Sequence, residues 1–109
     1  MKDLKLTLNL EELKLSEEDK KQSVQKIINN VIQNVVLGYG QQQRGFDEKE
    51  RRQYYKIADA LDEAEKSNAE LVKLEDDQMG FLKKCFKESK LMPNSLLRQI
   101  EDLILGKQD

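Results

Sequence analysis

The sequence predicts an α+β domain that is mostly helical, with about four helices and a small two-stranded sheet in the order strand, helix, helix, strand, helix, helix. Near the start of the chain, leucine alternates with polar residues, which is typical of a strand with one buried face. Over most of the remainder, apolar residues recur every three or four positions, which is typical of amphipathic helices. The 109 residues fit one domain. We expect this domain to span residues 1–106, with a frayed C-terminus at 107–109.

The first strand is predicted at about residues 3–10. Every second residue there is a leucine, and the residues between them are polar or charged. Because successive side chains of a strand point to opposite faces, this pattern buries one face only. The buried face consists of Leu4, Leu6, Leu8 and Leu10.

A long helix is predicted over about residues 17–37. Ser16 can accept hydrogen bonds from the first unpaired amides, and the acids that follow it suit the positive end of the helix dipole. Gly38 predicts a left-handed residue that ends the helix. Its apolar positions form one helical stripe: Val24, Ile27, Ile28, Val31, Ile32, Val35 and Val36.

The polar side of this long helix is rich in amides, and Lys26 is its only charge between residues 22 and 37. Amides cost less to bury than charges, but they still need hydrogen-bond partners. Two interpretations stay open: a solvated face of moderate polarity, or a face that meets another copy of the chain in a homo-oligomer. The second interpretation predicts self-association through Gln25, Asn29 and Gln33.

Residues 38–46 are predicted to form a loop, because they contain three glycines between two helical patterns. Aromatic and arginine side chains anchor many protein interfaces, so the loop is a candidate partner-binding segment. The alternative is that Tyr39 and Phe46 pack onto the core, with Phe46 against the start of the next helix. The candidate partner-binding residues are Tyr39, Arg44 and Phe46, with Tyr55 nearby on that helix.

The second helix is predicted to begin at Asp47 and to end near Ser67, because Asp47 and Glu50 have the spacing of a capping box. A short strand is predicted at Glu70–Leu74, where aliphatic residues lie between polar boundaries. Its natural partner is the first strand, since both strands need an edge to pair with.

Two more helices complete the chain. The acids at residues 75–77 predict the start of the third helix, and Pro93 fits the first position of the fourth. The fourth helix is predicted over about 94–105 and is closed by Gly106. The inward positions of the third helix are Met79, Leu82, Cys85 and Phe86.

Residues that support catalysis are sparse. The chain has no histidine, which removes the most common general base and metal ligand. A single cysteine excludes both an internal disulfide and a thiolate metal cage, and Cys85 shares a helical face with Leu82 and Phe86, which predicts a core thiol. The acidic run at 75–77 lacks the spacing of a calcium loop, and the glycines of 38–45 lack the context of a nucleotide-binding loop. We therefore expect no enzyme activity, no cofactor and no metal site.

The charge balance argues against two classes of partner. With 19 basic and 21 acidic residues, the net charge is −2, whereas dedicated binders of nucleic acid or anionic membranes are usually basic. Residues 47–78 are the most acidic part, with 6 basic and 11 acidic residues. The longest apolar runs have three residues, and the N-terminal stretch lacks the apolar region of a secretory signal. We expect no membrane partner and a cytoplasmic location.

A small DNA-binding regulator stays open as an alternative function. The last two predicted helices and the turn between them could form a helix-turn-helix, with the last helix as the reading helix. The residues predicted to contact DNA are Lys84, Arg98 and Gln99. Glu101 and Asp102 on the same helix would oppose phosphates.

Three stretches of the chain resemble small uncharacterised accessory proteins of tailed phages and prophages: Lys56–Ala64, Leu71–Asp77 and Phe81–Lys84. Those proteins tend to combine an N-terminal leucine-rich strand and a long helix with a helix–strand–helix ending. The resemblance is one of layout over most of the chain, and it carries over no functional residue. It implies a virion-assembly factor or a modulator of a host protein in the host cytoplasm. The leading prediction is a non-catalytic protein–protein interaction module, because catalytic chemistry is absent, the long helix has an amide-rich face and the loop at 38–46 is aromatic.

Overall fold

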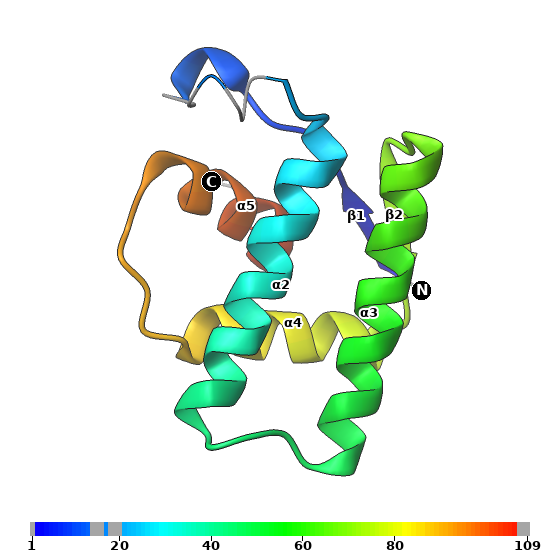
Figure 1. Ribbon diagram of the computed structural model, residues 1–109, viewed down its shortest axis with the longest axis vertical. Helices are drawn as coiled ribbons and strands as arrows, with labels where there is room; N and C mark the ends of the chain where they lie inside the picture. Colours follow the sequence, from blue (N-terminus) through cyan, green and yellow to red (C-terminus); the bar gives the residue numbers. More distant parts are fainter. Residues whose placement is uncertain (1, 14–16, 18–20, 107–109) are drawn as a thin grey trace.

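The computed structural model describes residues 2–13, 17 and 21–106, and it confirms the predicted fold class (Figure 1). The chain is mostly helical and has one two-stranded antiparallel sheet. The elements in chain order are β1 (Lys2–Lys5), the short 3-10 helix η1 (Leu10–Glu12), α2 (Val24–Gln42), α3 (Glu48–Ser67), β2 (Leu71–Leu74), α4 (Asp76–Glu88) and α5 (Ser95–Leu105).

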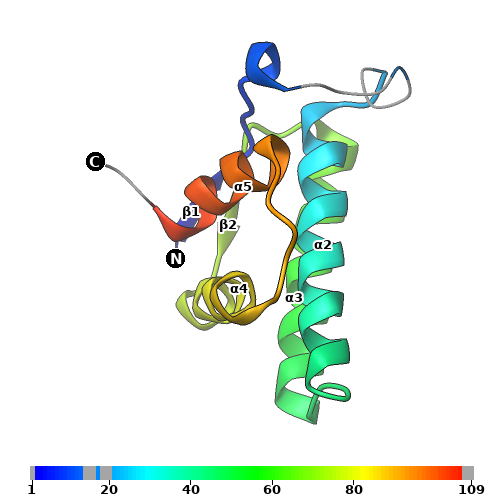
Figure 2. The same ribbon diagram turned by 90° about the vertical axis from the view of Figure 1, so that its left-hand side faces the viewer.

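The helices and the sheet form two layers around one core. The long helices α2 and α3 run antiparallel side by side, and the sheet, α4 and α5 cover one side of this pair (Figure 2). α4 crosses both long helices (Figure 1). Full burial of a large aliphatic side chain stabilises a fold by about 1.5–3 kcal/mol. The largest fully buried side chains are Leu4, Ile28, Ile32, Val36, Ile57, Leu61, Leu74, Leu82, Cys85 and Ile100.

The two strands pair as predicted, but the first strand is shorter than the predicted range of 3–10. Lys5 lies opposite Leu71, the first residue of β2, so the ladder partners end there. One more bond follows, from the amide of Leu6 to the carbonyl of Glu70 at 2.8 Å. The alternating leucines beyond Leu6 therefore have no strand to pair with, and Leu10 is exposed.

The long helix α2 begins and ends later than predicted. Ser23 caps it, because its hydroxyl accepts a hydrogen bond from the amide of Lys26 at 3.1 Å, whereas the predicted cap, Ser16, lies outside the described residues. Gly38 is helical rather than a left-handed cap, and the chain turns left-handed only at Arg44 (φ 61°) and Gly45 (φ 114°). The predicted loop at 38–46 is thus reduced to the short turn after Gln42.

The helix extends past Gly38 because its last turns pack into the core. Tyr39 and Gly40 are both buried. The ring of Phe46 lies directly over Gly40, so a methyl group at Gly40 would stand 2.6 Å from Cζ of that ring. Phe46 also stacks on Tyr54 and meets Phe81 edge-on, with ring centroids 6.3 and 5.9 Å apart. Tertiary packing of this kind commonly overrides the low helix propensity of glycine.

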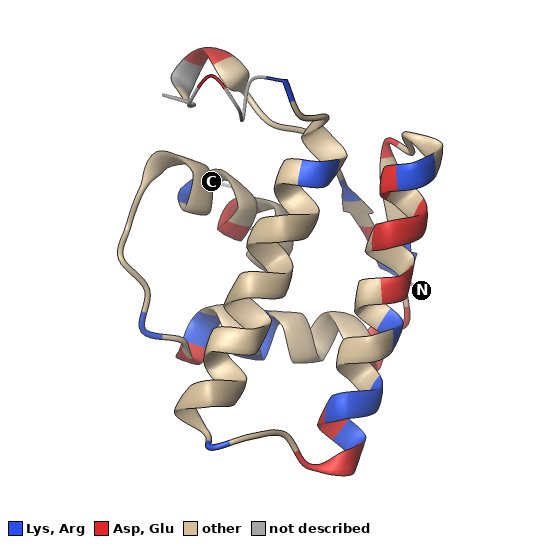
Figure 3. Cartoon of the chain, in the orientation of Figure 1, with Lys and Arg blue, Asp and Glu red and all other residues tan. Residues whose placement is uncertain are grey.

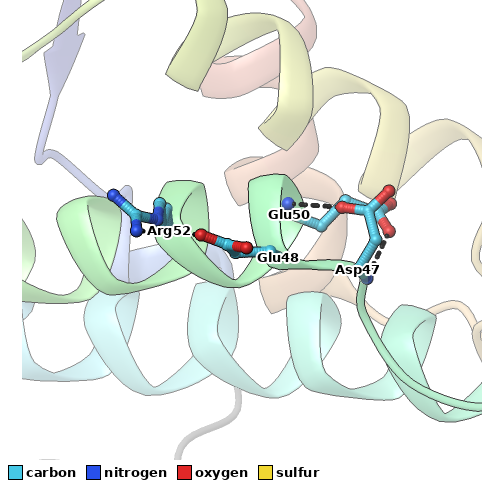
Figure 4. A network of polar contacts seen from close by, with 4 residues as sticks. All are labelled: Asp47, Glu48, Glu50 and Arg52. Atoms are coloured by element: carbon cyan, nitrogen blue, oxygen red, sulfur yellow. Dashed lines mark hydrogen bonds and ion pairs between the residues drawn. The ribbon is translucent and has the colours of Figure 1, made fainter.

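The predicted capping box of α3 is confirmed (Figure 4). The side chain of Asp47 accepts from the amide of Glu50 at 2.8 Å, and the side chain of Glu50 accepts from the amide of Asp47 at 3.1 Å. Arg52 and Glu48, four residues apart on the same helix, form an exposed ion pair at 2.8 Å, which contributes at most about 0.5 kcal/mol. α3 ends at Ser67, as predicted, and Asn68 caps it in a left-handed conformation.

The predicted third and fourth helices are α4 and α5. The four predicted inward positions of α4 are all buried. Pro93 does not occupy the first helical position, because Asn94 caps α5 by accepting from the amide of Leu97 at 2.8 Å, which leaves Pro93 before the cap. Gly106 closes α5 in a left-handed conformation, as predicted, and residues 107–109 lie outside the described residues.

The contact between Phe46 and Gly40 predicts different responses to alanine at two glycines of one helix. Gly40→Ala should displace the Phe46 ring, whereas Gly38→Ala meets nothing within 4 Å. We expect Gly40→Ala to be less stable than Gly38→Ala by about 1–3 kcal/mol in urea unfolding. Gly38→Ala should be slightly more stable than the wild type, by about 0.5–1 kcal/mol. Equal stabilities of the two variants would contradict this packing.

Candidate functional site

The four residues predicted for partner binding differ in how far they are exposed. Tyr39 is only 3% exposed, and its ring meets Phe81 edge-on at 6.5 Å. Phe46 is half-buried against the core, while Arg44 and Tyr55 are exposed, Tyr55 to 57%. The structure thus agrees with the alternative in which Tyr39 and Phe46 pack onto the core.

The three amides predicted for self-association point toward α3 and its C-terminal end. Gln25 Nε2 donates to the carbonyl of Ala69 at 2.8 Å. Asn29, only 3% exposed, donates from Nδ2 to Asp62 Oδ1 at 2.7 Å and to Glu65 Oε1 at 3.2 Å. These amides therefore find their partners within the chain, as buried polar groups require.

Gln33 completes this arrangement between the long helices. Its Nε2 donates to Asn29 Oδ1 at 2.6 Å, and its Oε1 accepts from the hydroxyl of Tyr54 at 3.1 Å. Burial, followed by the negative charge of Asp62, raises the pKa of Tyr54 above its ordinary value. We call this set of side chains the polar seam: Gln25, Asn29, Gln33, Tyr54, Asp62 and Glu65. It joins α2 to α3.

Of the residues predicted for DNA contact, only Arg98 makes no side-chain hydrogen bond, ion pair or ring contact in the described part of the chain, and it is exposed. Gln99 uses both ends of its amide on Asn9: its Oε1 accepts from the amide of Asn9 at 2.7 Å, and its Nε2 donates to the carbonyl of Asn9 at 3.1 Å. Lys84 lies 5.9 Å over the ring of Tyr39. A reading role for α5 would require Gln99 to give up these two bonds, so DNA binding stays an untested alternative.

The single thiol lies in the core. Cys85 is fully buried, and burial raises its pKa to about 12. At neutral pH it is therefore a neutral thiol, which is a poor nucleophile. In residues 2–13, 17 and 21–106, no group of three or more acidic or cysteine side chains is arranged to hold a metal ion. Within the same residues, no helix combines the length and the apolar character needed to cross a membrane.

A hollow of about 230 Å³ lies between α2 and the segment that joins α4 to α5. No charged side chain lines it, although 37% of the chain is charged. It is smaller than the roughly 300–1,000 Å³ of sites that enclose a small-molecule ligand, so its size fits one or two apolar side chains of another molecule. Its lining consists of Val31, Asn34, Val35, Leu91, Met92, Asn94, Leu96 and Leu97, and we call it the uncharged hollow.

Apolar side chains around the uncharged hollow are open to solvent. Met92 is 85% exposed, and Leu37, on the outer side of α2, is also exposed. α2 carries no charged side chain beyond Lys26, whereas α3 beside it carries both signs along its length (Figure 3). Two features of the sequence belong to this surface: the uncharged run 27–43 and the apolar residues at 91–93. Neither feature shows that the two segments meet.

Comparison of the chain with models of known protein families, with curated proteins and with solved structures found no match.

The polar seam predicts that Asn29→Asp is strongly destabilising. The new carboxylate would be buried beside Asp62 and Glu65, and the donor that both acids use would be lost. We expect a loss of about 2–4 kcal/mol at pH 7 in urea unfolding. The neighbouring acids raise the folded-state pKa of the new carboxyl above its unfolded value of about 3.9, so the loss should shrink as the pH falls below about 5.

Asn30→Asp is the matched control for this variant, because Asn30 is exposed on the same helix. We expect it to change the stability by less than about 0.5 kcal/mol. If both substitutions destabilised the fold equally, the seam would not be buried between the helices.

The buried thiol predicts a pH dependence. The folded-state pKa of Cys85 is raised from 9.0 to about 12, so only the unfolded chain ionises at pH 10. The stability that this neutral thiol contributes is complete below about pH 9 and is lost as the pH rises. Between pH 8 and 10, the wild type should lose about 1.4 kcal/mol relative to Cys85→Ala in urea unfolding. Parallel losses in the two proteins would show that the thiol is solvated.

Proposed function

We propose that the chain is a non-catalytic protein-binding module and that the uncharged hollow is where its partner docks. The observation that carries this proposal is an apolar hollow, without charge, beside a methionine that is 85% exposed. The centres of protein interfaces are depleted of charged residues and enriched in methionine and aromatic residues. A flexible thioether also adapts to partners of different shape.

Two further features support this surface over the sites predicted from the sequence. The amides of α2 that were predicted to meet a second chain are hydrogen-bonded within the chain. Tyr39, at the end of α2, is buried. The predicted partner-binding segment around the turn after α2 therefore exposes Arg44 but little apolar area. The uncharged hollow, by contrast, has two groups at its wall that can bond to the backbone of a docked segment: the amide of Asn34 and the Nδ2 of Asn94, whose Oδ1 caps α5.

The layout resemblance to phage accessory proteins guides the choice of partner. We propose a virion component or a host protein of the cytoplasm as the first class to test. A buried, reduced cysteine is compatible with that compartment.

A peptide selection tests the proposal. Peptides selected from a random display library on the immobilised full chain should bind Met92→Ser about ten-fold more weakly than the wild type, a loss of about 1.4 kcal/mol. Leu71→Ser is the matched control, because Leu71 is another exposed apolar side chain, on the sheet. Binding to this control should equal binding to the wild type.

Selected peptides that bind Met92→Ser and the wild type equally would place their site elsewhere. If they instead lost affinity for Tyr55→Ala, the site predicted from the sequence around Tyr55 would replace the uncharged hollow. A selection that enriches no peptide above the blank support would contradict the proposed function as a whole.

A further inference from the structure

We propose that the partner segment is an acidic amphipathic helix of a different protein, which places apolar side chains in the uncharged hollow and carboxylates against Lys90 and Arg98. This inference depends on the proposed function and names the class of partner. It follows from the charges around the hollow, from the hollow's continuation along α5, and from a glycine on the outer side of α2.

The charged residues that stand next in sequence to the lining residues of the uncharged hollow are both cations. Lys90 directly precedes the lining residue Leu91, and Arg98 directly follows the lining residue Leu97. Both cations are exposed. The other wall, formed by α2, has no charge after Lys26. A segment that enters the hollow therefore meets cations along one side and no charge along the other, which favours acidic residues beside its apolar anchors.

The uncharged hollow continues along α5 toward Arg98. A second hollow shares Asn94 and Leu97 with it and adds Arg98 and Glu101 to the lining. A third hollow, along Ser95, Arg98, Gln99 and Asp102, adjoins the second. Arg98 thus lies where the apolar part of this surface passes into its polar part. Glu101 lines the second hollow together with Arg98, and Asp102 lines the third together with it.

Gly38 favours a helix as the docked segment. It lies four residues after Asn34 and three after Val35, so it continues the helical face that lines the hollow. Its backbone is helical, and a methyl group built on it would meet nothing within 4 Å. Glycine at that position costs helix stability and gains no contact within the chain. Because no side chain projects at Gly38, a second helix can approach α2 closely there, as in helix-in-groove recognition.

A second copy of this chain fits the same surface less well. A two-fold contact of the hollow with itself pairs each patch with its own copy. It would bring two sets of Lys90 and Arg98 to one interface, where the uncharged hollow itself supplies no acid to pair with them. Because like charges at an interface oppose association, the cations favour a different, acidic partner.

Two synthetic helical peptides of about 18 residues test the inference. Both have leucine at the same positions of one face, and the other face carries glutamate in one peptide and lysine in the other. In fluorescence titrations with the full chain, the glutamate peptide should bind at least ten-fold more tightly at about 20 mM salt. The advantage should shrink at about 500 mM salt, where surface charges are screened.

Variants of the full chain then locate the contact. The double variant Lys90→Glu and Arg98→Glu should reverse the preference and bind the lysine peptide more tightly, which also shows that it is folded. Gly38→Ala should weaken binding of the glutamate peptide several-fold. Gly80→Ala is its matched control, because Gly80 is also a helical glycine whose added methyl group would meet nothing within 4 Å, but it lies in α4 outside the hollow.

The other outcomes overturn the acidic class of partner, and some of them overturn the proposed function as well. Equal or tighter binding of the lysine peptide by the wild type overturns the acidic class of partner. If neither designed peptide binds, but display-selected peptides still require Met92, the acidic class is wrong and the proposed function stands. If the selected peptides do not require Met92, the proposed function fails too. A dimer in light scattering that Met92→Ser dissociates would identify a second copy as the occupant and overturn the inference.

Discussion

The rotation of α2 about its own axis depends on the polar seam. Asn29 is buried beside two carboxylates and donates to both, and Gln33 bonds in turn to Asn29 and accepts from Tyr54. A buried amide without such partners would cost roughly 1–3 kcal/mol, so these positions must face α3. With the amides toward α3 and the apolar stripe toward the sheet, α4 and α5, the remaining side of α2 faces outward. That side carries Asn34 and Gly38.

The segment between α4 and α5 supplies the other wall of the uncharged hollow. It has no regular secondary structure from Leu91 to Asn94, and it passes along α2 (Figure 2). Leu91 is half-buried against the core, whereas Met92 beside it is almost fully exposed. Asn94 then caps α5, which fixes where the helix and Arg98 begin. One wall therefore depends on a helix cap and the other on the seam.

Features set by neighbouring residues could be predicted from the sequence. The fold class, the capping box at Asp47 and the Gly106 terminus follow from periodicity and from local cap chemistry. The length of β1 could not be predicted, because it is limited by the four residues of β2. The end of α2 could not be predicted either, since it depends on Phe46 packing over Gly40.

The candidate site was harder to predict than the fold, because its parts come from opposite halves of the chain. The amides of α2 were recognised as unusual, but their acceptors, such as Asp62, lie a full helix away in sequence. From the sequence alone, these amides are consistent with a solvated face or with a face that meets another chain. The hollow combines α2 with residues 91–97, and only the fold brings these segments together. Two local motifs gave wrong predictions. Gly38 is helical instead of ending α2. Pro93 precedes the cap of α5, since a cap at Asn94 is as consistent with the sequence as a proline at the first helical position.

The NMR spectrum of the full chain with labelled methionine methyl groups, recorded during titration with a peptide that binds, tests whether the partner docks at the uncharged hollow. Met79 is an internal control for Met92, because Met92 is exposed at the uncharged hollow while Met79 is buried in the core. If the partner docks at the uncharged hollow, the Met92 methyl signal shifts progressively with binding while the Met79 signal stays in place. Saturable binding that leaves the Met92 signal unmoved would show that the partner docks elsewhere.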